Sequence, residues 1–365
     1  MRVALFIPNL EGGGAERVTV NLANGFASRG MSCDVVAASA NGVLADELCR
    51  SVRVIDLGAS RVVRSVIPLA RYLHRERPRV LISALDYANA CALVAAKLSF
   101  AGTKVVVAVH ISRSMASANA SGFKDWVLRA MIRHGYPLAE GIVAVSAGAA
   151  DDLAVHAGID RRRIAVIYNP IVGGALWEKA AESVSDPFVG EGVPLVLGMG
   201  RLARQKDFPN LVSAFSTLRR KRVAKLLILG EGEERKAIEA LIARLGLGSE
   251  VGLPGYVKNP YPYLKKAAVF ALSSAWEALP TVLIEALALG TPIVSTDCPC
   301  GPREILGSGA WGRLVPPGNA AKLAEALEAA IEQPPRPAPK AAWERFEICR
   351  GVKTYVDLLE GMCGA

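Results

Sequence analysis

The chain has 365 residues, of which 52% are hydrophobic and 21% are charged, and its formal net charge is +9 at pH 7. This composition is typical of a soluble globular protein, and the length predicts two domains rather than one core. No apolar run reaches the roughly 18 residues of a membrane-spanning helix, and Met1–Pro8 is too short for the core of a secretion signal. The seven cysteines include one close pair, Cys298 and Cys300, with no second pair or nearby histidine. Reduced thiols in a cytoplasmic protein, without a metal site, are therefore expected.

Short β-branched runs alternate with helical segments along the whole chain, which is the pattern of parallel sheets wrapped by helices. In the first half the expected strands are Val3–Pro8, Cys33–Ala38, Val52–Leu57, Val80–Ala84, Val105–His110, Gly141–Ser146 and Ile164–Tyr168. In the second half they are Pro194–Gly200, Lys225–Gly230, Val251–Gly255, Val269–Ser273, Pro292–Ser295 and Gly312–Val315. Two successive units of this kind predict an α/β fold of two Rossmann-like, doubly wound domains. Such domains bind ligands at the carboxyl ends of their strands and are expected to face each other across a cleft.

The expected domain boundaries follow from composition. Residues 1–172 form the first Rossmann-like domain, residues 173–193 a linker rich in glycine and serine, and residues 194–340 the second domain. Pro334–Pro339 is a stiff, extended connector. Residues 341–365 follow it with a final helix, expected from about Ala342 to Met362.

The segment Ser274–Gly290 predicts a helix suited to an anion, with one glutamate ahead of its start and one inside it. Pro280 suits the first turn and Gly290 the position just past the last. The free N–H groups of the first turn favour a phosphate, while the carboxylates of Glu277 and Glu285 can accept hydrogen bonds from sugar hydroxyls. The alternative is a capping carboxylate and an ordinary exposed glutamate.

Two further loops follow strands. Gly12–Gly14 let the backbone approach a ligand at the start of a helix, but their spacing disfavours a dinucleotide and favours a phosphate or sugar. Arg201 and Lys206 follow the first strand of the second domain, where two cations can neutralise a diphosphate. Two ordinary surface cations are the alternative for this pair.

His110 ends the run Val105–His110 at the expected cleft edge. A lone histidine is more often structural, but its place at a strand end favours a functional role. No nucleophile elbow, Cys/His pair or metal-ligand cluster is present in the sequence, and basic segments lack interleaved aromatics, which disfavours nucleic acid.

The positive charge is concentrated in the first half, where residues 1–170 carry 20 Lys/Arg and 13 Asp/Glu. Arg61, Arg64, Arg71 and Arg75 fall on one side of a predicted helix, and apolar residues fall on the other. Such a helix can rest on an anionic membrane surface. The alternative is the solvated face of a core helix, which Pro68 weakens.

The motifs now in view occur in the order found in retaining glycosyltransferases of family 4, and the chain resembles that family over nearly its whole length. The resemblance is carried by Gly12–Val18, Asn169–Ile171, Gly200–Lys206, Leu229–Arg235, Gly255–Val257, the pair Glu277 and Glu285, and Val294–Leu306. The last of these is similar to members that build bacterial surface glycans. The resemblance implies the GT-B architecture, with an acceptor-side first domain, a nucleotide-sugar-binding second domain, and a final helix that crosses back to the first.

The resemblance also implies roles for individual residues. Catalytic roles fall to His110, Arg201, Lys206 and Glu277. Donor binding falls to Gly13, Gly14, Tyr256, Val257, Leu279, Pro280, Thr281 and Glu285. Among these, the first glutamate contacts the sugar hydroxyls, the second binds the ribose, and the two cations bind the diphosphate. Ala278 departs from the family, in which many members have glycine.

The implied reaction is metal-independent transfer of a hexosyl or N-acetylhexosaminyl group from a nucleotide-diphosphate sugar, UDP-sugars being favoured over GDP-sugars, with retention of configuration. No cofactor is expected beyond the donor, and the acceptor is a glycan or polyprenyl-linked sugar at the inner face of the cell membrane. Two alternatives stay open. One is a non-catalytic sugar-nucleotide-binding subunit of a glycan assembly complex, and the other is a nucleotide-sugar epimerase on the same scaffold.

Overall fold

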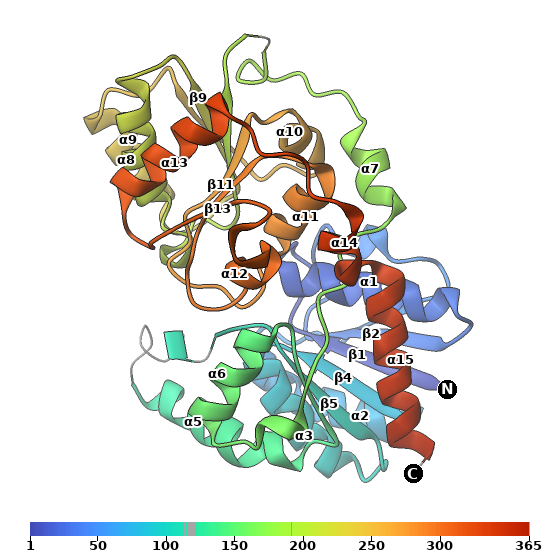
Figure 1. Ribbon diagram of the computed structural model, residues 1–365. Coiled ribbons are helices and arrows are strands. Elements are labelled where there is room, and N and C mark those ends of the chain that lie inside the picture. Colours follow the sequence, from blue (N-terminus) through green and yellow to red (C-terminus); the bar gives the residue numbers. More distant parts are fainter. Residues whose placement is uncertain (113, 116–121, 191, 365) are drawn as a thin grey trace. The chain divides into compact units, whose positions relative to one another are not determined.

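A computed structural model of the chain describes residues 1–112, 114–115, 122–190 and 192–364. The chain divides into two compact units, Met1–Ile171 with Phe346–Ala365, and Val172–Arg345 (Figure 1). Each unit has its own parallel sheet and its own core. In the described part of the chain no helix is both long and apolar enough to span a membrane.

The first unit is built on a sheet with the strand order β3-β2-β1-β4-β5-β6-β7, and all neighbouring strands are parallel. Its strands are β1 (Arg2–Ile7), β2 (Ser32–Ala37), β3 (Arg53–Asp56), β4 (Val80–Ala84), β5 (Lys104–Val109), β6 (Gly141–Ala144) and β7 (Ile164–Val166). The central strands β4, β5 and β6 are almost entirely buried, because helices cover a parallel sheet on both faces. This double burial explains their uninterrupted apolar runs.

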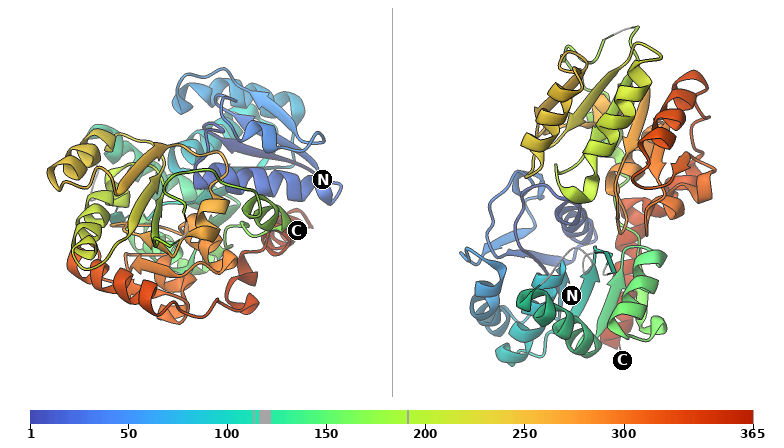
Figure 2. Two further views of the ribbon diagram at one scale, coloured as in Figure 1. Left: turned by 90° about the horizontal axis from the view of Figure 1, so that it is seen from above. Right: turned by 90° about the vertical axis from the view of Figure 1, so that its left-hand side faces the viewer.

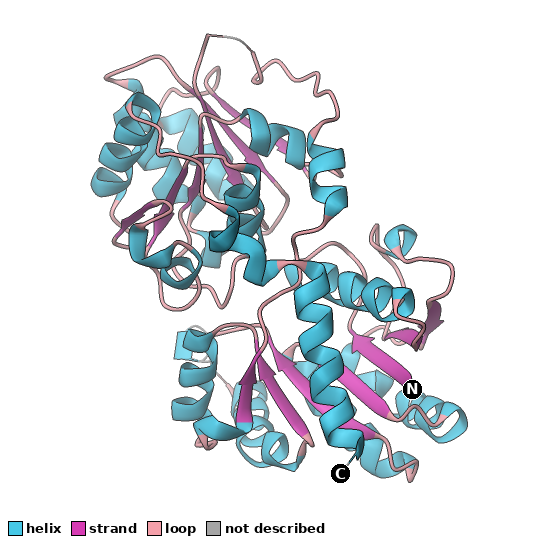
Figure 3. Ribbon diagram, turned by 45° about the vertical axis from the view of Figure 1, so that its right-hand side comes forward, coloured by secondary structure: helices cyan, strands magenta, loops and turns pink. Residues whose placement is uncertain are grey.

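Helices cover this sheet in two groups. The helices are α1 (Gly14–Ser28), α2 (Val66–Glu76), α3 (Asp86–Ser99), α5 (Phe123–Gly135), α6 (Ala147–Ala157) and α15 (Ile348–Gly364). Short 3-10 turns are η1 (Ala45–Glu47), η2 (Val62–Ser65), η3 (Tyr136–Leu138) and η4 (Arg161–Arg163). Helix α1 packs against α15, whereas α3 packs between α2 and α5. Figure 3 shows α15, which leads to the C-terminus, lying across the strands of this sheet.

The second unit has the strand order β10-β9-β8-β11-β12-β13, again parallel throughout. Its strands are β8 (Leu195–Met199), β9 (Lys225–Leu229), β10 (Val251–Gly255), β11 (Val269–Leu272), β12 (Ile293–Thr296) and β13 (Arg313–Val315). Its helices are α7 (Gly174–Ala180), α8 (Phe208–Arg219), α9 (Arg235–Arg244), α10 (Tyr261–Lys266), α11 (Thr281–Leu289), α12 (Pro302–Ile305), α13 (Ala320–Glu332) and α14 (Lys340–Trp343), with 3-10 turns η5 (Arg204–Lys206), η6 (Gly307–Gly309) and η7 (Glu344–Phe346). Helices α8, α9 and α13 form one packed group, and α7, α10, α11 and α14 form another.

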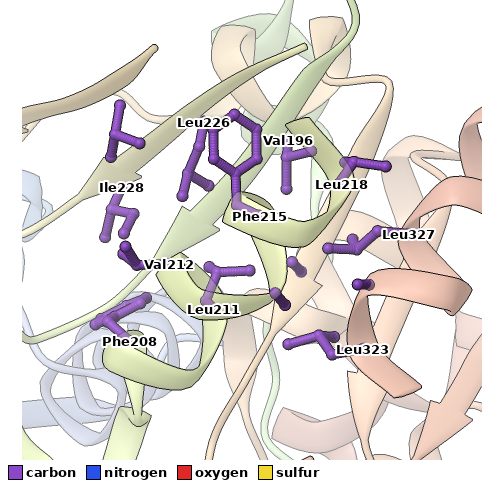
Figure 4. Close-up of a cluster of buried hydrophobic side chains, with 14 of the residues drawn as sticks. Val196, Phe208, Leu211, Val212, Phe215, Leu218, Leu226, Ile228, Leu323 and Leu327 are labelled. Carbon is purple, nitrogen blue, oxygen red and sulfur yellow. The ribbon is translucent and has the colours of Figure 1, made fainter. Parts of the chain in front are cut away.

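The core of the second unit lies between its sheet and helices α8 and α13. Phe215 and Leu211 of α8 pack on Leu226 of β9, and Leu323 and Leu327 of α13 complete the cluster (Figure 4). Figure 2 shows α8 in yellow-green and α13 in orange-red against this sheet. Burying each large apolar side chain contributes about 1.5–3 kcal/mol, so this cluster fixes the sheet that carries the functional loops.

The strands expected from the sequence are all present, with ends that differ by one or two residues. The helices differ more from those expected from the sequence. Residues 173–193, expected as a linker, contain α7, which packs on α10 within the second unit. The expected single final helix is divided into α14, η7 and α15, and α15 belongs to the first unit. The predicted basic helix begins as the 3-10 turn η2, so Pro68 falls in the first turn of α2, where its missing N–H group is not needed.

A polar network ties the edge of the first sheet to α2. The Asp34 carboxylate, 4% exposed, accepts hydrogen bonds from Arg2, Arg53 and Tyr72 at 2.9, 2.8 and 2.5 Å. Both arginines also contact Glu76, at 2.6 and 2.9 Å. Burial acts to raise the pKa of Asp34, but the hydrogen bonds from Arg53 and Tyr72 and the charge of Arg2 lower it. Hydrogen bonds from Arg53 and Arg2 lower the pKa of Glu76 to about 2.

This network predicts acid sensitivity of the first unit. Both carboxyl groups have lower pKa values in the folded than in the unfolded state, so their stabilisation is complete above the unfolded values, 3.8 and 4.5, and is lost as pH falls through the folded values. The Arg53→Met variant should therefore lose stability at pH 7 and show a flatter decline between pH 4.5 and about 2. Hydrogen exchange of the β1 and β2 amides measures this.

The matched control is Lys353→Met, which breaks an exposed ion pair with Asp357 in the same unit. It should leave the profile within about 0.5 kcal/mol of the wild type, because exposed pairs contribute little. Equal acid slopes for Arg53→Met and the wild type would show that the network does not set this dependence.

Candidate active site

Two loops of the second unit meet where its strand order reverses. Strands β8 and β11 are neighbours in the sheet, although β9 and β10 separate them in the sequence. In an open parallel sheet, such a reversal opens a crevice between the loops that follow these two strands at the carboxyl edge. Here those loops are residues 200–207 and 273–280.

An ion pair joins the two loops. Lys206 Nζ lies 2.5 Å from Glu277 Oε1, and the two side chains are 17% and 7% exposed. Ser274 Oγ donates a hydrogen bond to the same carboxylate oxygen at 2.7 Å, and Gln205 Nε2 lies 3.4 Å from Oε2. Because an ammonium group has three N–H donors, Lys206 can bind Glu277 and an anion together. The pair therefore suits a ligand that carries a phosphate next to hydroxyl groups.

Backbone contacts hold both members of the pair in place. Ser273 Oγ donates to the carbonyl oxygen of Lys206 at 2.7 Å, and the Ala275 amide donates to that of Gln205 at 2.8 Å. Gln205 Nε2 donates in turn to the carbonyl oxygen of Trp276 at 2.9 Å. We did not predict the supporting roles of Gln205, Ser273 and Ser274 from the sequence. Their one signal was a position in the loops already singled out, beside Lys206 and Glu277.

Glycines allow the neighbouring loop after β9 to pack closely on the loop after β8. Gly230 has a φ of 139°, and a Cβ atom there would lie 2.0 Å from the carbonyl oxygen of Gly200. A Cβ atom on Gly232 would lie 2.3 Å from the carbonyl oxygen of Leu202. These contacts give a physical reason for the Leu229–Arg235 motif, since any larger residue would push the Lys206 loop out of place.

Helix α11 carries the second glutamate. Pro280 is its N-cap, with φ −66° and ψ 109°, and no side chain caps the N-terminus that starts at Thr281. Gly290 ends it with a φ of 75°. Glu285 is only 5% exposed, and Tyr261 Oη lies 3.4 Å from its Oε1. The alternative of a capping carboxylate and an exposed glutamate is therefore wrong, because neither Glu277 nor Glu285 has that environment.

The loop after β12 supports the turn that leads into α11. Gly301 has a φ of 83°, and a Cβ atom on it would lie 2.7 Å from Pro280 Cδ and 2.9 Å from the carbonyl oxygen of Ala278. Ala278 and Leu279 are buried in this turn, at 4% and 5% exposure. The methyl group of Ala278 is thus packed inside the unit.

The cysteine thiols do not form a metal site within the residues that the structure describes. Burial, followed by the nearby charge of Glu277, raises the pKa of Cys298 to about 12, so this thiol stays protonated at neutral pH. Over residues 1–112, 114–115, 122–190 and 192–364, no three or more His, Cys, Asp or Glu side chains are grouped so as to hold a metal ion.

Arg201 lies apart from the ion pair. Its guanidinium is 74% exposed and binds Glu233, with Nη2 3.0 Å from Oε2. Tyr256 and Val257 follow the edge strand β10, two strands away from β8 in the sheet, and Tyr256 is 49% exposed. The structure therefore brings Lys206 and Glu277 together, whereas Arg201 and Tyr256 remain at the rim.

The first unit also has a candidate ligand-binding edge, at the carboxyl ends of its strands. Gly13 is the N-cap of α1, the helix that follows β1, Gly14 is the first helical residue, and His110 directly follows β5. Only β4 separates β1 from β5, so the carboxyl ends of these two strands are about 10 Å apart across the sheet. Loss of hydration lowers the pKa of His110 to about 4, although the ring is partly exposed. His110 is therefore neutral at pH 7.

Between these positions the chain leaves β4 through a strained residue. Leu85 has φ 75° and ψ 140°, a region that only glycine adopts at low cost and that tends to occur at functional sites. The next residue, Asp86, is buried and accepts a hydrogen bond from Tyr136 Oη at 2.9 Å. Asn89 donates to the same hydroxyl at 3.0 Å. We did not predict roles for these residues from the sequence, because their contacts join separate elements.

Comparison with known proteins gives the family. Residues 12–172 match the family model described as Glycosyltransferase Family 4, and residues 182–343 match Glycosyl transferases group 1. The chain belongs to glycosyltransferase family 4. Its fold is GT-B, since the Anabaena protein HepE, solved in complex with UDP-glucose, matches it with a TM-score of 0.82 over 99% of this chain and 100% of that one at 19% identity. The expected family and fold class are confirmed.

Curated relatives match parts of the chain. A Campylobacter jejuni N-acetylgalactosamine-N,N'-diacetylbacillosaminyl-diphospho-undecaprenol 4-alpha-N-acetylgalactosaminyltransferase is 34% identical over 58% of this chain and 56% of its own length. A second enzyme of that organism, the GalNAc-alpha-(1->4)-GalNAc-alpha-(1->3)-diNAcBac-PP-undecaprenol alpha-1,4-N-acetyl-D-galactosaminyltransferase, is 26% identical over 90% of this chain and 88% of its own. The chain thus spans little more than half of the first relative, and less of two others.

The ion pair predicts a stability contrast between the two cations of this family 4 member. Lys206→Met should cost about 1–3 kcal/mol of unfolding free energy, because it leaves the Glu277 carboxylate buried without its cation. Arg201→Met should change stability by less than about 0.5 kcal/mol, since Arg201 is exposed. Denaturant unfolding followed by tryptophan fluorescence measures both.

A double-mutant cycle separates the pair from its surroundings. Adding Glu277→Gln to Lys206→Met should recover part of the lost stability, because the uncompensated charge is removed. Strictly additive losses would mean that the two side chains are not coupled.

Proposed function

We propose that the protein transfers a hexosyl or N-acetylhexosaminyl group from a nucleotide-diphosphate sugar to the hydroxyl of a glycan or polyprenyl-linked acceptor, with retention of configuration. The proposed setting is bacterial surface polysaccharide or glycoconjugate synthesis, which agrees with the diphospho-undecaprenol substrates printed in the names of two relatives. The observation that carries the proposal is the buried Lys206–Glu277 pair at the switch point of the second sheet.

The pair suits the two ends of the reacting bond. Glu277 accepts hydrogen bonds from the donor-sugar hydroxyls, while Lys206 lies beside it and stabilises the charge that develops on the departing diphosphate. The first-turn N–H groups of α11 and Arg201 add positive charge at this edge. Because the protein's own groups provide this positive charge, we propose that the reaction needs neither a metal ion nor a cofactor.

Other residues position the donor and the acceptor. Glu285, nearly buried in α11, binds the ribose hydroxyls, and the backbone around Tyr256 and Val257 contacts the base, for which uracil is proposed. Gly13 and Gly14 approach the diphosphate from the first unit. Neutral His110 can donate or accept one hydrogen bond near the reacting sugar without adding charge. Retention follows if the acceptor oxygen bonds to the anomeric carbon on the face from which the diphosphate leaves, while the departing phosphate takes the acceptor proton.

Donor turnover tests the transfer. Wild-type protein should hydrolyse or transfer sugar from a UDP-sugar in preference to GDP-sugars. Glu277→Ala and Lys206→Ala should each lower kcat/KM by at least about 10²-fold, as expected for loss of a group that acts on the transition state. The matched control, Lys221→Ala, removes an exposed lysine paired with Glu328 and should retain wild-type turnover.

The outcomes separate the rival functions. If no common nucleotide sugar is consumed, but one still raises the Tm, the protein is a sugar-nucleotide-binding subunit rather than an enzyme. Conversion of the donor sugar into its epimer without release of the nucleotide would instead show an epimerase.

We also propose contact with the anionic inner face of the cell membrane through the segment around α2. Arg61, Arg64, Arg71 and Arg75 are all exposed, while Leu69 and Leu73 of the same helix are buried in the first unit. The segment thus anchors Leu69 and Leu73 in the core and keeps its cations outside, as an electrostatic contact requires, while Val63 and Ile67 are also exposed. Each arginine near an anionic bilayer contributes about 1 kcal/mol.

Vesicle binding tests this contact. Replacing the four arginines by glutamine should weaken binding to phosphatidylglycerol vesicles by about 10²-fold or more, and added salt should weaken wild-type binding. Glutamines at Arg161, Arg162 and Arg163 of η4 serve as the control and should have a small effect. Binding that is insensitive to salt, or equal for both variants, would contradict a contact through α2.

A further inference from the structure

A groove of about 590 Å³ lies between α3 and α5 of the first unit, two helices that pack side by side (Figure 1). Most of its lining is aliphatic. Representative lining residues are Leu93, Val94, Val127, Ala130, Met131 and Leu138. Thr103 and Val105, at the amino end of β5, also line it. His110 lies at the other end of that strand, about 20 Å away, so the groove is distinct from the candidate active site.

Large apolar side chains are exposed in the groove and at the C-terminal end of α3. Phe100 is 88% exposed, Trp126 64%, Leu138 58% and Leu98 50%. In the described part of the chain, eight of the fifteen exposed large hydrophobic residues lie between residues 62 and 138. These eight are Val63, Ile67, Tyr87, Val94, Leu98, Phe100, Trp126 and Leu138. Of these eight, Val94, Trp126 and Leu138 line the groove itself. Exposed apolar side chains in one hollow favour an interaction surface, because water-exposed apolar patches are otherwise kept small.

The charges at the groove select the chemistry of its occupant. Lys97 lines the groove, and Arg133 lies seven residues after Trp126, on the same face of α5. Neither forms an ion pair with any described residue. Of the nearby acids, Asp125 is paired with Arg129 at 2.5 Å, and Glu140, which also lines the groove, accepts a hydrogen bond from the Val105 amide at 2.7 Å. The apolar groove, with Lys97 and Arg133 beside it, therefore suits a ligand that has an apolar chain attached to an anionic group.

We propose that this groove binds a hydrocarbon chain of an anionic bilayer lipid, with the lipid headgroup at Lys97 and Arg133. Trp126 and Phe100 then sit at the membrane–water interface, where aromatic side chains are favoured. Two kinds of contact, an inserted chain and a basic surface, hold a protein on a membrane far better than either alone. The site extends the proposed membrane contact beyond the α2 arginines, and it does not depend on the transfer reaction.

The test uses the whole chain and vesicles of phosphatidylglycerol whose acyl chains carry bromine, a short-range quencher of indole fluorescence. Trp126 is the one tryptophan in the first unit, and replacing the other four tryptophans by phenylalanine isolates its signal. Binding should quench Trp126, and the quenching should persist at a salt concentration that releases purely electrostatic contacts. Vesicle-bound protein without quenching would overturn the proposal.

Two variants fill or alter the groove without removing charge. Ala130→Phe should weaken binding to phosphatidylglycerol vesicles by about tenfold. Val94→Ser should also weaken vesicle binding. Because Val94 is partly exposed and tolerates a polar group, this variant serves as a check in case Ala130→Phe misfolds. The matched control is Val155→Ser on α6, where the side chain is 78% exposed and lies outside the groove. Wild-type binding by both groove variants would overturn the proposal.

The outcomes of these experiments distinguish the lipid groove from the α2 contact and from the transfer reaction. If only the α2 arginine variant loses binding, the electrostatic contact stands and the lipid groove is wrong. If the protein turns over a nucleotide sugar but binds no vesicles, both membrane proposals fail while the transfer reaction stands. If a protein partner covers the groove instead, vesicles will not quench Trp126, which again contradicts a lipid occupant.

Discussion

The Lys206–Glu277 ion pair is the interaction around which the second unit is organised at its functional edge. It joins the loops after β8 and β11, which the reversal of strand order places opposite each other. A pair of this kind costs desolvation, and the hydrogen bonds that Ser274 and Gln205 make to the carboxylate offset part of that cost. The same arrangement leaves a cation beside an acceptor of hydroxyl groups. The same arrangement of the two side chains therefore joins the loops and provides the groups proposed for the chemistry.

The sequence predicted the sheets well because their signal is local. Strands such as Val80–Ala84 are runs of apolar residues that a doubly covered sheet requires. It also singled out Lys206 and Glu277, whose roles stay predictions, because each lies in a loop that follows such a strand. It could not predict that Arg201 would turn away to Glu233, or that Gln205 and Ser273 would hold the loops, because these contacts join residues far apart in the chain. Helix α7 was missed because short helices depend on packing rather than propensity.

The two units divide the proposed tasks between them. The second unit places fixed charge at one sheet edge and suits a nucleotide sugar. The first places an uncharged histidine and glycine backbone at its own carboxyl edge, and exposes apolar and basic surface along α2, α3 and α5. A lipid contact at the amino end of β5 would keep the carboxyl edge clear of the bilayer, so one unit can serve both an acceptor and a membrane.

The placement of α15 has a consequence for how the chain is made. Gly25 of α1 approaches this helix so closely that a Cβ atom would lie 2.3 Å from Val352, and Tyr355 and Leu359 are buried in the first unit. The first unit therefore stays incomplete until residues beyond Phe346 have left the ribosome, whereas Val172–Arg345 is continuous. The second unit can finish folding first, so a nascent chain exposes the surface that α15 later covers for most of its synthesis.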